Sequence, residues 1–360
     1  MDKITLSARP RKPEDVAEFT KELNSVYGRD NISPSALKKL VEDSQAFYKG
    51  YIRGEWDDII SPRMIEGSAV HKAIEIYYGN TYTASTAQEV QELINIAVNY
   101  FAFEVAKNSE LIKWGDKDSV ESSIVRISSA ITNFVANDPF TNCDEVTSEC
   151  KVFAPFQFQS ELESPLMMSC IMDSVKKIQN SNKIIVVDYK LVSIFETAEE
   201  SFKKYIYQYG FYYYACLHET GEAPSQFIIC QIKAKASSVN LTVAELQILL
   251  SNNKITYPDK AKKDVLIAKA ITSELIEKPT NTNLLIYDYN AKTLAVFEEL
   301  YWRGIYMLYV ACTLDDLIFM PSALAWNSSS FDDFVLEATG NLEKTEKKDI
   351  ETMPAYLLDF

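Results

Sequence analysis

The sequence contains little histidine and no paired cysteine motif, and both shortages exclude classes of metalloprotein. Only two histidines, His71 and His218, occur in 360 residues, and the six cysteines form no Cys-x-x-Cys pair. No uncharged apolar run reaches the roughly 18 residues of a membrane span, and the N-terminus has no apolar signal-peptide core. We therefore expect a reduced, cytoplasmic protein without zinc and without contact to a membrane.

Positive charge is also scarce. The chain has 36 lysines and arginines against 51 acids, a formal charge of -15 and a pI near 4.8, which argues against broad attraction to nucleic acid. A nucleic acid would have to meet a local basic groove. The negative charge of carboxylates that bind metal ions is compensated once the metal is bound, so an acidic total charge does not exclude a nucleic-acid partner.

The hydrophobic pattern predicts an α+β fold with a central mixed β-sheet flanked by helices. Helical periodicity predicts helices over 34–52, 64–78, 87–106, 119–135 and 196–218, the first capped by Ser33 and followed by Pro34. Apolar, β-branched runs predict strands over 148–158, 166–178, 183–192 and 226–233. A turn over 179–182 makes the second and third of these strands an antiparallel hairpin.

No segment has the composition of a clean linker, so we expect one large core with appended parts. These are an N-terminal extension over 1–30, a core over 31–236 with a helical insertion at about 85–140, and a C-terminal α/β region over 237–360. The last region contains a predicted strand over 284–289, an aromatic helix over 292–312 and an acidic tail. The tail could be a docking peptide for a replication or recombination partner, although a solvated tail is the reading we favour.

Two carboxylates and a lysine stand out on the predicted hairpin. Asp188 and Lys190 project from the same side of their strand because side chains alternate faces, and the turn lets Asp173 converge with them. Converging carboxylates are hard oxygen ligands that suit Mg²⁺ or Mn²⁺. The alternative is an ordinary cross-strand ion pair between Asp173 and Lys190, worth roughly 0.2–1 kcal/mol. Against it, Asp188 ends a wholly apolar run, where a charge is costly unless it has a task.

The predicted helix after the hairpin contains Lys204, Gln208 and Tyr212 at a spacing of four residues. This spacing puts the three side chains on one face, which could meet a phosphate backbone. Most tyrosines of this helix are better explained by packing against the sheet. Gln208 differs, because a neutral amide among aromatic side chains needs hydrogen-bond partners.

In order and context, these features resemble the PD-(D/E)XK nuclease superfamily, most of all its RecB-type and phage exonuclease branch. The matching pieces, over about residues 31 to 236, are Ile32-Ser33-Pro34-Ser35-Ala36-Leu37, Gly67-Ser68-Ala69-Val70-His71, Asp173, Asp188-x-Lys190 and Gln208-x-x-x-Tyr212. Two departures from the family pattern leave the expected ligands in place. Met172-Asp173 stands where the family has Pro-Asp or Gly-x-x-Asp, and Asp188 replaces the commoner glutamate.

The resemblance implies a restriction-endonuclease-like core and assigns roles to the matching residues. Asp173, Asp188 and Lys190 would be catalytic, and the metal ligands would be His71, Asp173, Asp188 and the carbonyl of Tyr189. Gln208 and Tyr212 would contact the substrate, with Lys204 beside them. Glu149, on the strand before the hairpin, would support a metal-bound water, or else be a solvated strand glutamate. No cysteine precedes residue 143 and no C-terminal triplet exists, so we expect no iron-sulphur cluster.

The resemblance implies a Mg²⁺-dependent DNA exonuclease of phage recombination, repair or genome processing, in a bacterial or phage-infected cell. A metal-activated water would attack the phosphodiester in line. A homo-oligomer with a basic channel, or a recombination or replication protein, could be a partner. Two alternatives stay open: a structure-specific or nicking endonuclease, and a catalytically silent nucleic-acid-binding or scaffolding module. The intact set from His71 to Gln208 argues against the silent module.

Overall fold

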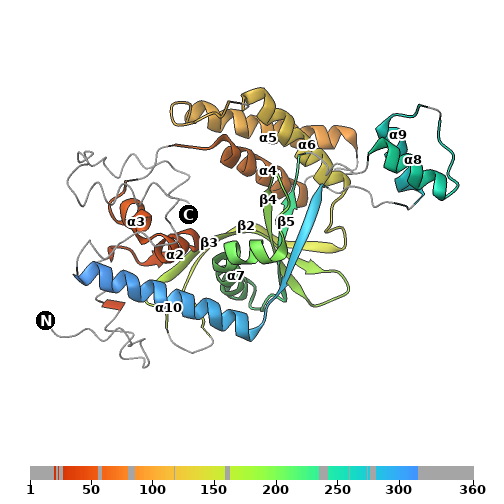
Figure 1. Cartoon of the computed structure of the whole chain (residues 1–360). Helices are drawn as coiled ribbons and strands as arrows, with labels where there is room; N and C mark the ends of the chain where they lie inside the picture. The colour runs from red at the N-terminus through yellow and green to blue at the C-terminus, as the bar shows by residue number, and fades with distance from the viewer. Residues whose placement is uncertain are drawn as a thin grey trace.

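The computed structural model describes residues 20–21, 23, 27–55, 59–79, 86–116, 118–158, 163–234, 242–258, 260–273, 275 and 281–314. Within these ranges, a mixed β-sheet is flanked by helices, which confirms the predicted fold class (Figure 1). Most of the predicted N-terminal extension and the acidic tail lie outside the described residues.

The strand β3 (Met167–Ile178) is the centre of the sheet. Along one edge it pairs antiparallel with β2 (Cys143–Ala154). Along the other edge it pairs first with β1 (Asn31–Ile32), in parallel, and then with β4 (Ile184–Leu191), antiparallel. The pairing with β4 begins only at Ser174 and Val187, so β3 and β4 separate just where Asp173 and Asp188 follow. The sheet continues through β5 (Gln226–Ile232), parallel to β4, and β6 (Thr282–Asp288), antiparallel to β5.

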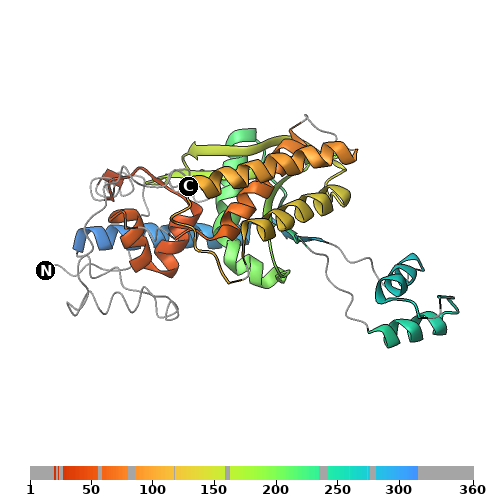
Figure 2. The same cartoon turned by 90° about the horizontal axis from the view of Figure 1, so that it is seen from above.

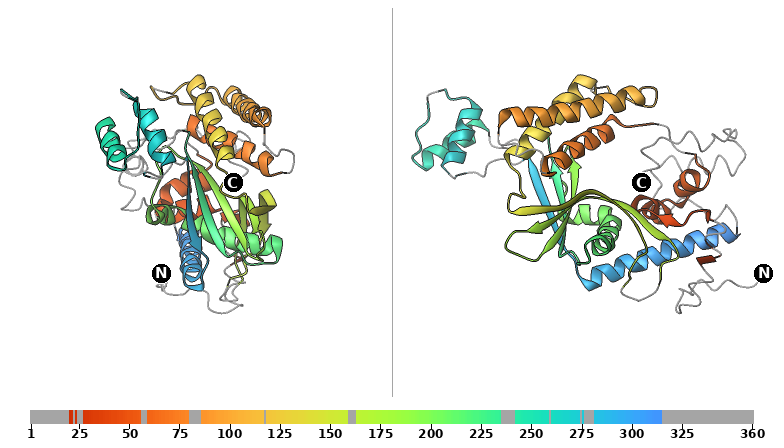
Figure 3. Two further views of the ribbon diagram at one scale, coloured as in Figure 1. Left: turned by 90° about the vertical axis from the view of Figure 1, so that its right-hand side faces the viewer. Right: turned by 180° about the vertical axis from the view of Figure 1, so that it is seen from behind.

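Helices cover both faces of the sheet (Figures 1 and 3). One face packs against α2 (Pro34–Glu42), α7 (Ala198–Thr220) and α10 (Ala291–Leu314) in an aromatic core that includes Phe47, Phe211 and Phe297. The other face packs against α4 (Pro62–Tyr78), α5 (Ala87–Lys107) and α6 (Val120–Ala136), in a core that includes Val70, Phe101, Ile131 and Val187. The predicted hairpin turn is present, and Asn180 takes a left-handed φ of 59° within it.

A buried carboxylate fixes α4 against α6. Glu66 is fully buried and accepts hydrogen bonds from Ser123 Oγ at 2.7 Å and Arg126 Nε at 3.0 Å. Arg63, which lies on α4 itself, adds a further contact at 3.3 Å. A buried charge with several donors resists displacement, because losing one partner leaves an uncompensated charge. The helix that contains His71 is therefore held in one position.

The single helix predicted over 34–52 is wrong, because the helix breaks at Asp43. Here α2 ends at Glu42, and a short α3 (Ser44–Phe47) and a π-helical turn, η1 (Tyr48–Ile52), follow. Asp43 leaves the helical region, and its Oδ1 accepts a hydrogen bond from the Ala46 N–H at 3.1 Å. A side chain that caps a new helix competes with continuing the old one.

The part of the chain after residue 236 contributes to the same sheet and core. The strand β6 pairs with β5 along its length, and Phe297 of α10 packs in the aromatic core under α7. Between them, α8 (Val243–Asn252) and α9 (Lys263–Thr272) form a small cluster of their own, apart from the sheet (Figure 2). Among the described residues the cysteines are free, and no helix is long and apolar enough to cross a membrane.

The contact between α7 and α10 gives a stability test. A Cβ at Gly210 would lie 2.1 Å from Phe297 Cγ, so Gly210→Ala should overpack the core and destabilise the fold by roughly 1–3 kcal/mol. Gly67, on α4, has nothing within 4 Å of its would-be Cβ. Gly67→Ala is the control and should stabilise by about 0.5–1 kcal/mol. Urea unfolding followed by circular dichroism measures both, and an unchanged Gly210→Ala would mean that α10 does not pack on α7.

Candidate functional site

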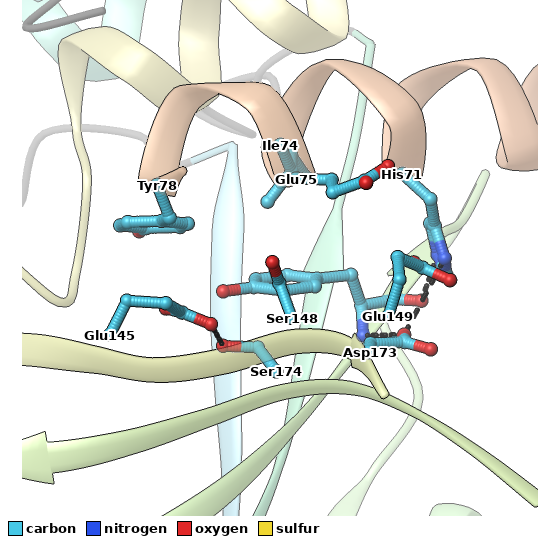
Figure 4. A pocket seen from close by; sticks show the side chains of 10 residues that line it. His71, Ile74, Glu75, Tyr78, Glu145, Ser148, Glu149, Asp173 and Ser174 are labelled. Atoms are coloured by element: carbon cyan, nitrogen blue, oxygen red, sulfur yellow. Dashed lines mark hydrogen bonds and ion pairs between the residues drawn. The ribbon is translucent and has the colours of Figure 1, made fainter. Parts of the chain in front are cut away.

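Side chains from four elements lie near the point where β3 and β4 separate, and Figure 4 shows three of them, His71, Glu149 and Asp173. His71 comes from α4, Glu149 from β2, Asp173 from β3 and Asp188 from β4. The first three line one depression between α4 and the sheet, whose wall also includes Glu75 and Glu145. So many carboxylates around one space favour a cation within it.

A backbone carbonyl of β4, that of Tyr189, lies next to His71. His71 Nε2 lies 2.6 Å from the carbonyl oxygen of Tyr189, and His71 Nδ1 lies 3.5 Å from Asp173 Oδ2. The Tyr189 N–H donates to the same Asp173 oxygen at 2.8 Å. Asp173 is therefore oriented by the strand that contains Asp188, and imidazole, carboxylate and carbonyl converge on one point.

Glu149 reaches this point through an irregular backbone. It has a φ of 46°, in the left-handed region, where a residue with a Cβ is disfavoured. Ser148 and Glu149 both line the depression, as do Asp173 and Ser174 opposite them, although neighbours in a regular strand point to opposite faces. Glu149 and Asp173 are missing from the β2–β3 ladder, which has a second irregularity between Glu145 and Thr147. Backbone strain of this kind gathers at functional sites, which favours a task for Glu149 over a solvated glutamate.

The donor atoms fit a divalent metal ion. One ligand atom each from His71, Glu149 and Asp173 can be chosen so that all lie within 4.8 Å of one another. One imidazole nitrogen and several carboxylate oxygens suit Mg²⁺ or Mn²⁺, which take oxygen ligands and keep some waters. Asp188 is not one of these three residues, and its buried Oδ2 makes no well-directed hydrogen bond but lies 2.8 Å from Lys190 Nζ.

Asp188 is the best-enclosed charge of the site. Its side chain is fully buried, and Lys190 Nζ lies 2.9 Å from Oδ1 and 2.8 Å from Oδ2. Tyr212 Oη donates to Oδ1 at 3.3 Å, and Gln208 Nε2 lies 3.5 Å away from the same oxygen. The Gln208 amide, which lies among aromatic side chains, thus has polar partners. Through Gln208 and Tyr212, α7 fixes the orientation of the Asp188 carboxylate.

Burial shifts the protonation equilibria of three groups. It raises the pKa of Asp188 to about 6, where the charge of Lys190 opposes the shift and that of Asp173 adds to it. Burial and the charge of Asp173 raise the pKa of Glu149 to about 7. For Lys190, burial favours the neutral amine, but Asp188 and Asp173 outweigh it and raise its pKa. The site therefore keeps a charged ammonium beside carboxylates that take up protons easily.

The predicted site residues fall into two groups. His71, Asp173, Asp188, Tyr189, Lys190, Gln208, Tyr212 and Glu149 all lie around the point where β3 and β4 separate. Lys204 does not touch Asp188, and its Nζ pairs with Glu196 at 2.9 Å. The alternative ion pair between Asp173 and Lys190 is not formed, since the ammonium is paired with Asp188.

Sequence reasoning missed a buried pair behind the site. Lys176 is only 1% exposed, its ammonium pairs with Glu145, and its Nζ lies 3.1 Å from the centre of the Tyr78 ring. Ser174 Oγ also donates to Glu145 at 2.6 Å. The pair supports the wall of the depression on the side away from His71. Nothing in the sequence signals it, because a lysine near the end of a strand is ordinarily exposed.

Comparisons with known proteins agree with the site. The family model described as the PD-(D/E)XK nuclease superfamily matches residues 31–294, more than half of the chain. No curated protein sequence matches. Among solved structures, the chain is similar to the crystal structure of a candidate exonuclease from Eubacterium rectale, with 11% identity and a TM-score of 0.46 over 95% of this chain and 97% of that one. At that identity and TM-score, the structural similarity supports no functional conclusion.

Two variants of Glu149 separate its charge from its backbone strain. Glu149→Gln and Glu149→Gly should both weaken Mn²⁺ binding by about 10- to 100-fold, because both remove the carboxylate. Without metal, Glu149→Gly should be no less stable than Glu149→Gln, since glycine adopts a positive φ without the Cβ clash, worth roughly 1–2 kcal/mol per residue. Calorimetric Mn²⁺ titration and urea unfolding measure the two effects. Wild-type Mn²⁺ affinity in both variants would exclude Glu149 from the site.

The raised pKa of Glu149 predicts a pH dependence of stability. Between pH 4.5 and about 7 the folded protein binds a proton at Glu149 that the unfolded chain releases. Stability in EDTA should therefore fall as the pH rises through this window. Glu149→Gln removes this group and should flatten the curve, leaving the part due to Asp188. Melting temperatures measured from pH 4.5 to 8 test this, and superimposable slopes would contradict it.

Proposed function

Because the chain belongs to the PD-(D/E)XK nuclease superfamily, we propose that it is a metal-dependent deoxyribonuclease, and more specifically an exonuclease. The observation that carries the proposal is the cluster of His71, Glu149 and Asp173, with the pair of Asp188 and the charged Lys190 beside it where β3 and β4 separate. A phosphodiester has the complementary chemistry, an anion that needs cations around its reacting phosphorus.

Each side chain has a distinct role in this proposal. His71, Asp173, Asp188 and the Tyr189 carbonyl would hold the ion, and Glu149 would complete the set or orient a water beside it. A bound Mg²⁺ or Mn²⁺ would polarise the phosphate and lower the pKa of the attacking water. Lys190 places its ammonium against the negative charge that grows on the phosphate oxygens. Gln208 and Tyr212 hold Asp188 in orientation from α7.

The silent-module alternative is disfavoured by the cost of the arrangement. A fully buried Asp188 and a strained Glu149 both reduce stability, and a binding module needs neither. Features that lower stability are retained where the activity of the protein depends on them. The endonuclease alternative uses the same residues, so it differs only in how DNA reaches them.

We further propose that DNA is met by local lysines, since the chain as a whole is acidic. Lys38 of α2, Lys190 of β4 and Lys204 of α7 come from separate elements, and Lys38 Nζ donates to the Lys204 carbonyl at 3.2 Å. A homo-oligomer with these lysines on an inner channel would suit an exonuclease. The biological setting that we propose is phage recombination, repair or genome processing.

Digestion of end-labelled linear DNA and of covalently closed circles, with Mg²⁺ or with EDTA, tests the function. Wild type should digest only the linear form and only with Mg²⁺. Asp188→Asn and Lys190→Ala should each lower the rate by at least about 100-fold, as expected when a charge that stabilises the transition state is removed. The matched control is Lys203→Ala, an exposed lysine of α7 paired with Glu199, which should keep the wild-type rate.

Each other result selects an alternative. Cutting of the closed circle would identify an endonuclease. Activity that survives in EDTA, or in Asp188→Asn, would place the chemistry elsewhere. Intact substrates after prolonged incubation of wild type with Mg²⁺ and with Mn²⁺ would favour the binding module.

A further inference from the structure

Tyr205, on α7, lies between two lysines of the proposed site. Lys190 Nζ is 5.5 Å and Lys204 Nζ is 5.0 Å from the centre of its ring. Lys204 directly precedes Tyr205 on α7, whereas Lys190 comes from β4, so the contact with Lys190 depends on the packing of α7 against the sheet. Two ammonium groups that repel one another are thus gathered against one aromatic side chain.

The partners of Lys204 hold it in this place. Its Nζ pairs with Glu196 at 2.9 Å, and Glu196 is in turn fixed by a hydrogen bond from Ser201 Oγ at 2.7 Å. The side chain of Lys204 remains 48% exposed, so its charge is open to a further anion. Lys190 is 24% exposed and combines its contact to the ring with its pair to Asp188.

An aromatic ring suits this position for a physical reason. A carboxylate at Tyr205 would hold both ammonium groups more strongly but would cancel the charge that a phosphate needs. The electron-rich face of a ring attracts a cation within about 6 Å without adding a net negative charge. The ring therefore orients the two lysines without adding a further negative charge to those of Asp188 and Glu196.

We propose that Tyr205 is a positioning residue that holds Lys190 towards the phosphate being cleaved and Lys204 towards a neighbouring phosphate of the same strand. This inference rests on the proposed nuclease function and adds a residue outside the family-like motifs. Tyr205 is half-buried, whereas Tyr207, Tyr209, Tyr212 and Tyr214 of the same helix are buried. Core packing alone does not explain why its ring meets two ammonium groups.

The first experiment compares Tyr205→Leu, which removes the ring, with Tyr205→Phe, which keeps it. Tyr205→Leu should lower kcat on linear DNA by about 5- to 30-fold, the equivalent of one partly desolvated cation–π contact, whereas Tyr205→Phe should restore most of it. Tyr213→Leu is the matched control, because Tyr213 is a half-buried tyrosine of α7 that packs against Tyr289 and meets no lysine in the described contacts. Its kcat should equal that of wild type.

The second experiment measures DNA binding in EDTA, which does not depend on turnover. Tyr205→Leu and Lys204→Ala should each weaken binding of a linear duplex a few-fold, and the double variant should lose less than the two single effects combined, because part of the effect of Tyr205 passes through Lys204. Melting temperatures of the single variants should match that of Tyr213→Leu, so that a loss of folding is recognised.

The outcomes separate this inference from the proposed function. Active wild type with equal kcat for Tyr205→Leu, Tyr205→Phe and Tyr213→Leu would overturn the role of Tyr205 and leave the nuclease intact. Additive losses of binding for Tyr205→Leu and Lys204→Ala would also overturn it. Inactive wild type would refute the nuclease, and the binding cycle would then decide on Tyr205. Wild type that neither cuts nor binds DNA would overturn both.

Discussion

The burial of one charged group, Asp188, organises the rest of the structure around it. A carboxylate in a protein interior loses its hydration, which costs several kcal/mol unless donors and a counter-ion replace the water. Lys190 supplies the counter-ion from two residues further along β4, and Tyr212 and Gln208 supply donors from α7. The separation of β3 and β4 at this point leaves open the space that a regular ladder would have filled.

The second face of the sheet places the remaining ligands. His71 can approach the Tyr189 carbonyl only if α4 keeps its distance from the sheet and its rotation about its own axis. The buried Glu66 fixes both through its hydrogen bonds to α6. On the opposite side, Lys176 and Glu145 support the wall beside Tyr78. Polar groups that are buried and fully paired fix the positions of the elements that contain them, because any small shift would break several hydrogen bonds together. The site is thus held by interior polar contacts on both of its sides.

Local pattern was sufficient to predict the parts of the site that depend on alternation and on a short turn. Asp188 and Lys190 share a face because they are two residues apart, and the turn over 179–182 returns the chain towards Asp173. What could not be predicted depends on distant parts of the chain. The return of β6 and α10 to the sheet, the short parallel β1 beside β3 and the burial of Lys176 are settled by partners far away in sequence. The left-handed backbone of Glu149 and the break at Asp43 compete with strong local patterns and leave no sign in them.

The way in which α8 and α9 join the body has a consequence for how such a protein can diversify. The strands β5 and β6 are paired at Ile232 and Thr282, and the Lys233 N–H donates to the Asn281 carbonyl at 2.8 Å, so the chain leaves and re-enters the sheet at one place. Lengthening a loop whose ends already meet costs only about 0.6 kcal/mol for each doubling of its length. The segment between these strands can therefore be exchanged, enlarged or shortened to a hairpin turn while the sheet and its carboxylates keep their geometry. A lineage could acquire new cellular contacts at this position independently of its chemistry.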